Sequence, residues 1–304
     1  MTGAGRDAAW ALGGIVSVGD VMTDVVVRAA SATAHGSDTP SHISTQGGGS
    51  AANVAAWIAA NRSPAAFVGR RGDDPFGLQA EQLLRDVGVQ VHLAVDPALP
   101  TGTCVVLVAP DGERSMFPDA GANAALSPDD LPPDLFARGR HLHLSGYPLL
   151  HVGARGAAFE ALGRARGAGM SVSVDPSSGG LLRAVGPDAF LDWIAGADLL
   201  LANDEEARVL AGCDDPDQAA GSLLEVCEAV VVKLGAHGAL VRSRDGSAAR
   251  VDAVPVDVVD TTGAGDSFAA GLLPAWRSGA GWPAALAAGS RLAATCVAQV
   301  GARP

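Results

Sequence analysis

From about residue 140 to the C-terminus, short strand-like runs alternate with helix-like segments. HLHLSG (141–146), MSVSVDP (170–176) and DLLLAN (198–203) indicate strands, and residues 153–169 and 186–197 indicate the helices between them. Such alternation is typical of βαβ units, whose crossover helices cover both faces of a mainly parallel sheet. The C-terminal half is therefore predicted to be a doubly wound α/β domain.

The N-terminal half begins with the same kind of unit but carries two β-rich inserts. GIVSVGD (14–20) and the helical segment 50–63 form the unit, and the inserts cover about residues 24–46 and 101–118. Pro110-Asp111-Gly112 predicts a turn between two strands of the second insert. The inserts are expected to pair into a small sheet that stands off the main domain as a lid. Since 48% of the residues are hydrophobic, we predict a single domain over residues 1–304 with one large core.

The overall charge points to a small-molecule partner. The formal net charge is −12, which disfavours long-range attraction to nucleic acid or to anionic membranes. No uninterrupted apolar run reaches the roughly 18 residues that a membrane span needs.

Residues 1–10 lack the basic start and apolar stretch of a signal peptide. The four cysteines (Cys104, Cys213, Cys227, Cys296) are scattered without metal-ligand spacing, so a protein of the reducing cytoplasm is expected.

DTTGAGDSF (260–268) precedes a helix-like segment and is the first candidate for chemistry. Gly263 and Gly265 allow a ligand to approach the backbone closely, and the following helix start directs free amide groups toward the same space. A phosphate suits such a turn. Taken alone, however, the motif favours the plainer interpretation of Asp266 as an ordinary acidic residue at the start of a helix.

A second glycine-rich segment, QGGGSAANVAAW, also precedes a helix. Asn53 falls on the first turns of that helix, where its amide can reach a ligand held at Gly48 and Gly49. The alternative is a loop followed by a helix of small residues packed on a sheet. A dinucleotide-binding site is disfavoured, because GGGSAAN lacks the GxGxxG spacing.

Two further segments follow predicted strands. In ANDEEARVL, Asn203 and Glu206 are three residues apart, which suits a helix cap and also a ligand site at the end of a parallel strand. In VVKLGAHGAL, Lys233, Gly235 and Gly238 are compatible with the entry to a simple hairpin.

The order of the motifs is more specific than any one of them. In that order the chain resembles the PfkB or ribokinase-like family of carbohydrate kinases, from about residue 13 to about residue 300, with DTTGAGDSF the most specific motif. The motifs are GD-x-x-x-D (19–24), GGSAAN (48–53), GRRGDDPFG (69–77), GAN (121–123), NDEE (203–206), KLGAHG (233–238) and DTTGAGD (260–266).

The resemblance implies a ribokinase-like fold and a role for each matching position. Asp266 matches the catalytic base that deprotonates the acceptor hydroxyl as it attacks the γ-phosphate of ATP. Beside a helix start it is expected to be ionised at neutral pH. The amides of Gly263, Ala264, Gly265 and Asp266 match an anion hole. The positions that match contacts to the sugar are Asp24, Gly48, Gly49 and Asn53.

The remaining matches concern ATP and ions. Asn203 and Glu206 match the pair that organises Mg²⁺ through water. The loop on the nucleotide side contains Lys233, Gly235 and Gly238, and Asp260 with Thr262 matches a monovalent-cation site, which implies K⁺ as a further ligand. The two inserts match the family's lid, through which many relatives form a homodimer.

The acceptor is left open. Ribokinases carry lysine at the third residue of the glycine motif, where this chain has Ser50, which argues against ribose and leaves room for a fructokinase-like or 2-keto-3-deoxygluconate kinase-like acceptor. Tyr147, in SGYPLL, either lines the acceptor pocket or belongs to the core. The alternative functions are a nucleoside kinase of the adenosine kinase type and, less favoured, a non-catalytic sugar-binding protein.

Overall fold

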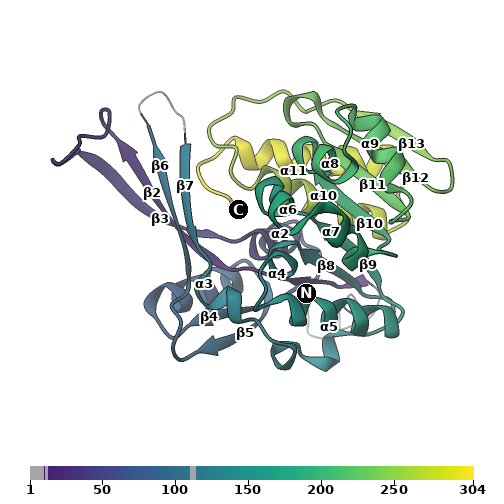
Figure 1. Cartoon of the computed structure of the whole chain (residues 1–304), viewed down its shortest axis with the longest axis horizontal. Helices are drawn as coiled ribbons and strands as arrows, with labels where there is room; N and C mark the ends of the chain where they lie inside the picture. The colour runs from purple at the N-terminus through teal and green to yellow at the C-terminus, as the bar shows by residue number, and fades with distance from the viewer. Residues whose placement is uncertain (1–9, 11–12, 110–113) are drawn as a thin grey trace.

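The computed structural model of the chain describes residues 10, 13–109 and 114–304 (Figure 1). The turn predicted at Pro110-Asp111-Gly112 and residues 1–9 lie outside the described residues. No described helix is both long enough and apolar enough to span a lipid bilayer.

A nine-stranded sheet forms the centre of the molecule, in the order β13-β12-β11-β10-β9-β8-β1-β4-β5. Its pairs are parallel from β5 to β11, and the pairs β11–β12 and β12–β13 are antiparallel, so β12 runs opposite to the other eight strands of this sheet. The strands are β1 (Ile15–Val18), β4 (Ala65–Gly72), β5 (Gln90–Asp96), β8 (His141–Ser145), β9 (Ser171–Asp175), β10 (Leu199–Asn203), β11 (Ala229–Lys233), β12 (Ala239–Ser243) and β13 (Ala248–Val251).

Helices cover both faces of this sheet. Alternate residues of a strand face opposite sides, so Val16 and Val18 of β1 belong to one apolar cluster and Ile15 to the other. The first cluster packs against α5 (Arg155–Gly167), α6 (Gly179–Val185), α7 (Pro187–Ile194), α8 (Asp204–Ala211) and α9 (Pro216–Leu223). The second packs against α2 (Ser50–Ala60), α3 (Pro75–Asp86), α10 (Ala264–Arg277) and α11 (Trp282–Val297). The predicted doubly wound, mainly parallel α/β fold is thus confirmed.

The two β-rich inserts form a separate four-stranded sheet in the order β3-β2-β6-β7. Its strands are β2 (Met22–Ala29), β3 (Ser41–Gly48), β6 (Gly102–Val108) and β7 (Arg114–Asp119). Figure 1 shows this sheet projecting from the main body, with its far end free of helices. We call it the small sheet.

Local signals place the helix starts that frame the candidate site. Asn203 and Glu206 form a reciprocal capping box at the start of α8, with each side chain accepting from the other residue's amide at 2.8 Å. The capping arrangement that the sequence suggests is therefore present. Strand order reverses between β8 and β1, so the carboxyl ends of these strands open a crevice where α/β sheets commonly bind ligands.

Candidate functional site

A cavity of about 680 Å³ lies at the carboxyl ends of the parallel strands, under the small sheet. The predicted site residues that line it come from segments spread over most of the chain, and they are Asp24, Gly49, Asn53, Tyr147, Asn203, Glu206, Lys233, Thr262, Gly263, Gly265 and Asp266. The fold therefore gathers most of the residues that the motifs single out. Gly48 and Asp260 line neither this cavity nor the second one described below.

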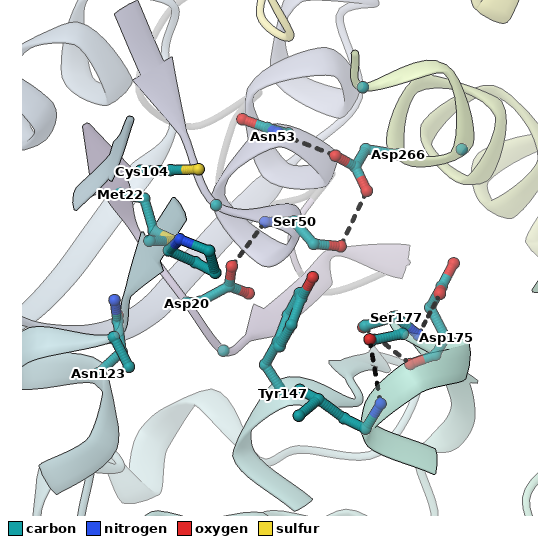
Figure 2. Close-up of a pocket in the computed structure, with 18 of the residues that line it drawn as sticks. Asp20, Met22, Ser50, Asn53, Cys104, Asn123, Tyr147, Asp175, Ser177 and Asp266 are labelled. Carbon is teal, nitrogen blue, oxygen red and sulfur yellow. Dashed lines mark hydrogen bonds between the residues drawn. The ribbon is translucent and has the colours of Figure 1, made fainter. Parts of the chain in front are cut away.

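Asp266 lies in the first turn of α10, directly after the turn at Gly263, whose φ of 77° is in the left-handed region. Its carboxylate accepts hydrogen bonds from two side chains of α2 rather than from the amides of its own helix (Figure 2). Ser50 Oγ donates to Oδ1 at 2.8 Å and Asn53 Nδ2 donates to Oδ2 at 2.8 Å. The segments 48–53 and 260–266, far apart in the sequence, thus meet at one carboxylate.

Asp266 was expected to be ionised because it lies at a helix start, but burial has the larger effect on its pKa. Burial raises the pKa of Asp266 to about 6, and the hydrogen bond from Asn53 opposes this rise. The helix start therefore does not lower the pKa of this carboxyl below its ordinary value. With a pKa of about 6 the group is still mostly ionised at pH 7, close to the range that suits a general base.

Asn53 is oriented by a residue that the motifs do not reveal. Arg303 Nε donates to Asn53 Oδ1 at 3.0 Å, and Arg303 Nη2 donates to the carbonyl of Gly48 at 2.5 Å. Asn53 must present its oxygen to the guanidinium and its NH₂ to Asp266, so the arginine fixes the amide orientation. Arg303 is next to last in the chain, and nothing in the sequence around it signals a role in this site.

Two acidic residues lie beside the glycine-rich segment. Asp24 is buried on β2 and faces the cavity, and burial raises its pKa to about 6 while the charge of Arg303 opposes the rise. Asp20 belongs to the motif GD-x-x-x-D but had no predicted role. Its carboxylate accepts from the amides of Ser50 at 2.9 Å and Ala51 at 3.3 Å. Asp20 therefore anchors the start of α2, while Asp24 lines the cavity.

A second acidic group lies on the opposite wall of the cavity. Lys233 Nζ is 2.6 Å from Oδ2 of Asp175, which ends β9 and was not singled out from the sequence. Burial raises the pKa of Glu206 to about 7, and the charge of Asp175 adds to the rise. A Cβ placed on Gly265 would lie 3.2 Å from Lys233 Nζ, so the ammonium group is next to the glycine turn. This wall thus combines one lysine with two carboxylates next to the glycine turn.

The oxygen donors on this wall suit Mg²⁺ held through water. Asp175, Asn203 and Glu206 offer the carboxylate and amide oxygens that this ion prefers, and Mg²⁺ usually keeps several of its waters. Within the described residues no group of three or more His, Cys, Asp or Glu side chains is arranged to hold a metal directly. An indirect, water-mediated arrangement therefore fits this chain better than a cage of protein ligands.

A second cavity, also of about 680 Å³, adjoins the first and shares Asn203, Lys233 and Gly265 with it. Gly235 and Gly238, which the resemblance assigns to the nucleotide side, line it, and so does Ala264 of the predicted anion hole. Apolar side chains form much of the remaining wall, namely Ala253, Val254, Pro255, Val256, Val258, Phe268, Ala293, Ala294 and Val297. The cavity suits a flat apolar ring whose charged tail reaches the shared residues.

Asp260 and Thr262 contact an arginine of the small sheet. Arg114 Nη1 is 2.6 Å from Asp260 Oδ1 and 2.9 Å from Thr262 Oγ1. Both residues that the resemblance assigns to a monovalent-cation site thus have a side-chain oxygen that already accepts from a guanidinium group. No feature of the sequence around Arg114 indicates this contact.

Tyr147 begins the short helix α4 (Tyr147–Leu150) and lines the first cavity. Figure 2 shows its ring projecting into the cavity, and the ring stacks on His151 with centroids 6.5 Å apart. Burial raises its pKa, so the hydroxyl stays protonated at neutral pH. Of the two interpretations of Tyr147, the position favours the pocket.

Comparisons with known proteins agree with this geometry. The family model for pfkB family carbohydrate kinases matches residues 13–304. The chain is 34% identical to an ATP-dependent ribose-1-phosphate kinase of Halopiger xanaduensis, over 86% of this chain and 84% of that protein. It is 36% identical to a fructokinase of Klebsiella pneumoniae, over 82% and 83%. The crystal structure of adenosine kinase from Sinorhizobium meliloti superposes with a TM-score of 0.85 at 28% identity, covering 96% of this chain and 95% of that one.

Proposed function

Because the chain belongs to the pfkB family of carbohydrate kinases, we propose that it transfers the γ-phosphate of ATP to a hydroxyl of a small sugar or sugar acid. It is a phosphotransferase with an alcohol group as acceptor. The observation that carries the proposal is the position of Asp266 beside Gly265, a residue that lines both cavities. A base at that point lies between an acceptor in one cavity and a nucleotide in the other.

In the proposed reaction Asp266 takes the proton of the acceptor hydroxyl. The hydroxyl oxygen attacks the γ-phosphorus, and ADP leaves with the electrons of the broken P–O bond. The free amides at the start of α10, from Gly263 to Asp266, stabilise negative charge on the group in transfer. Phosphoryl transfer needs positioning and charge stabilisation more than covalent help, so these groups form a sufficient set.

The nucleotide is proposed to bind in the second cavity. Its apolar wall accommodates the adenine, and Lys233 with the loop at Gly235 and Gly238 lies toward the phosphates. Asn203 and Glu206 would hold Mg²⁺ through water, together with Asp175, which the sequence did not suggest. When bound, the ion neutralises charge on the phosphates.

Asp24 is the proposed contact to the sugar hydroxyls. Its carboxylate is an acceptor-only group that faces the cavity, as a ligand rich in hydroxyl groups requires. Gly48 was expected to contact the sugar, but it does not line the cavity. Its carbonyl accepts from Arg303 instead. Gly49, which does line it, allows the chain to approach the acceptor closely.

One observation favours a nucleoside as the acceptor. The small sheet presents Met22, Cys104, Met116 and Pro118 to the cavity. These side chains are poor partners for sugar hydroxyls, but they suit the flat face of a base. Adenosine phosphorylation is therefore the second candidate function, and the adenosine kinase from Sinorhizobium meliloti shares this fold.

The acceptor class is tested by measuring ADP formation with Mg²⁺ and ATP across fructose, 2-keto-3-deoxygluconate, ribose, ribose 1-phosphate and adenosine. The sugar-kinase proposal expects the highest kcat/KM for a free sugar or sugar acid. A clear preference for adenosine would favour the nucleoside alternative. ATP binding without turnover on any acceptor would favour a binding protein instead.

The pH profile of kcat tests the base. Because burial raises the pKa of Asp266 to about 6 and that of Glu206 to about 7, kcat at saturating acceptor and Mg²⁺ is expected to be flat above about pH 8. It should fall roughly tenfold for each pH unit below the pKa of Asp266, as the base becomes protonated. Asp24 also has a pKa of about 6, so an Asp24→Asn variant serves as the control. The control should keep the acidic limb of kcat, and loss of that limb in the control would assign it to Asp24 instead.

The small sheet is proposed to act as a lid and as a dimer interface. The face opposite Asp24 carries exposed apolar side chains, including Ile43 at 61% and Phe117 at 59% exposure. A second copy would cover such a face, and a closed lid would keep water from the phosphoryl group. The use of ATP and the four free cysteines support the cytoplasm as the location, and the net charge of −12 disfavours nucleic acid and anionic membranes as partners.

A further inference from the structure

Arg114, the first residue of β7, connects the small sheet to the motif that precedes the catalytic base. Its guanidinium donates through Nη1 to Asp260 Oδ1 at 2.6 Å and to Thr262 Oγ1 at 2.9 Å. The arginine side chain is 25% exposed, whereas that of Asp260 is only 9% exposed. A charge-assisted contact of this kind, with its anion largely removed from water, is stronger than a surface ion pair.

Both oxygens of Asp260 are in use. Oδ1 also accepts from the amide of Thr262 at 2.8 Å, and Oδ2 accepts from the amide of Gly301 at 3.1 Å. Although burial acts to raise it, these hydrogen bonds and the charge of Arg114 hold the pKa of Asp260 below its ordinary value. The carboxylate therefore stays ionised and joins three segments, namely the motif 260–266, the C-terminal segment and the small sheet.

A monovalent cation bound by the side chains of Asp260 and Thr262 would compete with Arg114 for Asp260 Oδ1 and Thr262 Oγ1. An added positive ion would also lie close to a guanidinium that is already charged, which is unfavourable in a site with little water. The donor set of this chain thus does not fit K⁺ while Arg114 is in place. An arginine is permanently protonated, so its charge does not depend on the ionic composition of the solution.

We propose that Arg114 replaces the monovalent cation at Asp260 and Thr262, so that phosphoryl transfer by this enzyme does not require K⁺. This inference rests on the proposed function of the site. The charge of Arg114 neutralises Asp260 and braces the turn that leads into Gly263 and the catalytic base. Because Thr262 lines the acceptor cavity, the brace reaches the edge of the site itself.

Arg114 also links the phosphate-binding turn to the position of the small sheet, because it lies on β7. Asp260 belongs to the segment that leads into α10, but Arg114 belongs to the small sheet. Its positive charge reaches the turn only when β7 lies where it does here. The position of the small sheet over the acceptor cavity is thereby coupled to the electrostatics of the phosphate-binding turn.

Arg28 provides a matched control within the same sheet. It is in register with Val108, which is in turn in register with Arg114, so the two arginines lie in one row across the sheet. Among the described residues Arg28 forms no ion pair. Arg28→Ala therefore removes an equal charge from the small sheet without touching Asp260.

The experiment compares wild type, Arg114→Ala and Arg28→Ala in buffers of equal ionic strength that contain either K⁺ or tetramethylammonium as the monovalent cation. Wild type and Arg28→Ala should form ADP at the same rate in both buffers. Arg114→Ala should lose activity about tenfold or more in tetramethylammonium, since one stabilising charge beside the site is gone. It should regain part of that loss in K⁺, which can enter beside the unpaired Asp260.

Melting temperature in the same buffers gives a readout that does not need turnover. K⁺ should raise the melting temperature of Arg114→Ala relative to tetramethylammonium and should leave wild type unchanged. This readout holds even if no tested acceptor is phosphorylated, so failure of the proposed function can be told apart from failure of this inference. Stimulation of the wild type by K⁺, or an Arg114→Ala variant that responds to K⁺ in neither measurement, would overturn the proposal.

Discussion

Asp266→Asn is expected to lower kcat about a thousandfold while leaving ATP binding nearly unchanged, because general-base catalysis contributes effects of this order. The amide matches the carboxyl in size. It can still accept from Asn53 and donate to Ser50, so both contacts to α2 survive. What it cannot do is take the acceptor proton. Steady-state kinetics with the preferred acceptor, together with calorimetric titration by ATP, measure the two quantities separately.

The melting temperature of Asp266→Asn shows whether the variant is still folded. The pKa of Asp266 is raised from 3.8 to about 6 in the folded protein, so the folded state binds more protons than the unfolded state between these values. Stability therefore falls as pH rises through this window, and above it the buried charge is unfavourable. Asp266→Asn should accordingly melt no lower than wild type at pH 7. A loss of activity accompanied by a much lower melting temperature would point to misfolding rather than to a lost base.

Asp188→Asn is the matched control for Asp266→Asn. Asp188 is also an acidic residue in the first turn of a helix, α7, but it is exposed and lines neither cavity. Its replacement should leave kcat unchanged. If Asp266→Asn kept turnover within a few-fold of this control, the base role would have to pass to another group.

Gly263→Ala is expected to lower kcat about a hundredfold, because a misplacement of the order of 1 Å in a catalytic turn has effects of that size. Gly263 has a φ of 77°, and a Cβ there would lie 2.7 Å from the carbonyl oxygen of Ala302. That carbonyl is itself fixed, since Trp57 Nε1 donates to it at 2.8 Å. The turn rather than the C-terminal segment is therefore expected to move, and kcat should fall more than ATP affinity.

Gly279→Ala separates backbone strain from the clash at Gly263. Gly279 follows α10 with a φ of 83°, and a Cβ there would have no heavy atom within 4 Å. Its replacement should reduce stability by about 1 kcal/mol through left-handed strain alone and leave kcat intact. Equal kinetics for the two variants, measured beside their melting temperatures, would contradict a catalytic role of the turn at Gly263.

The fold was predictable because it depends on patterns that are local in the sequence. The strands at residues 141–145 and 171–175 are short apolar runs between helical segments, and that alternation favours parallel pairing without knowledge of any contact. The two inserts were recognisable for the same reason, as strand-like runs interrupting a βαβ unit. The capping box of Asn203 and Glu206 is also local, and it formed at the predicted residues.

Contacts between distant segments were not predictable in this way. Arg303 orients Asn53 from 250 positions away, and Arg114 reaches Asp260 from 146 positions away. In the sequence, Asp175 is only a polar residue at the end of a strand. Its contact with Lys233, at 2.6 Å, exists only in the folded chain. The residues next to an arginine or aspartate in the sequence do not identify its ion-pair partner, because the pairing depends on the path of the backbone between the two residues.

The fold class, the family and the candidate base were predictable from the amino-acid order, since motif order and periodicity are properties of the chain alone. How that base is held depends on the folded molecule. Ser50 and Asn53 occupy the carboxylate of Asp266, burial sets its pKa, and Arg114 occupies the oxygens where a cation was expected. These features depend on burial and on distances between remote segments, and such quantities come into existence only when the chain is folded.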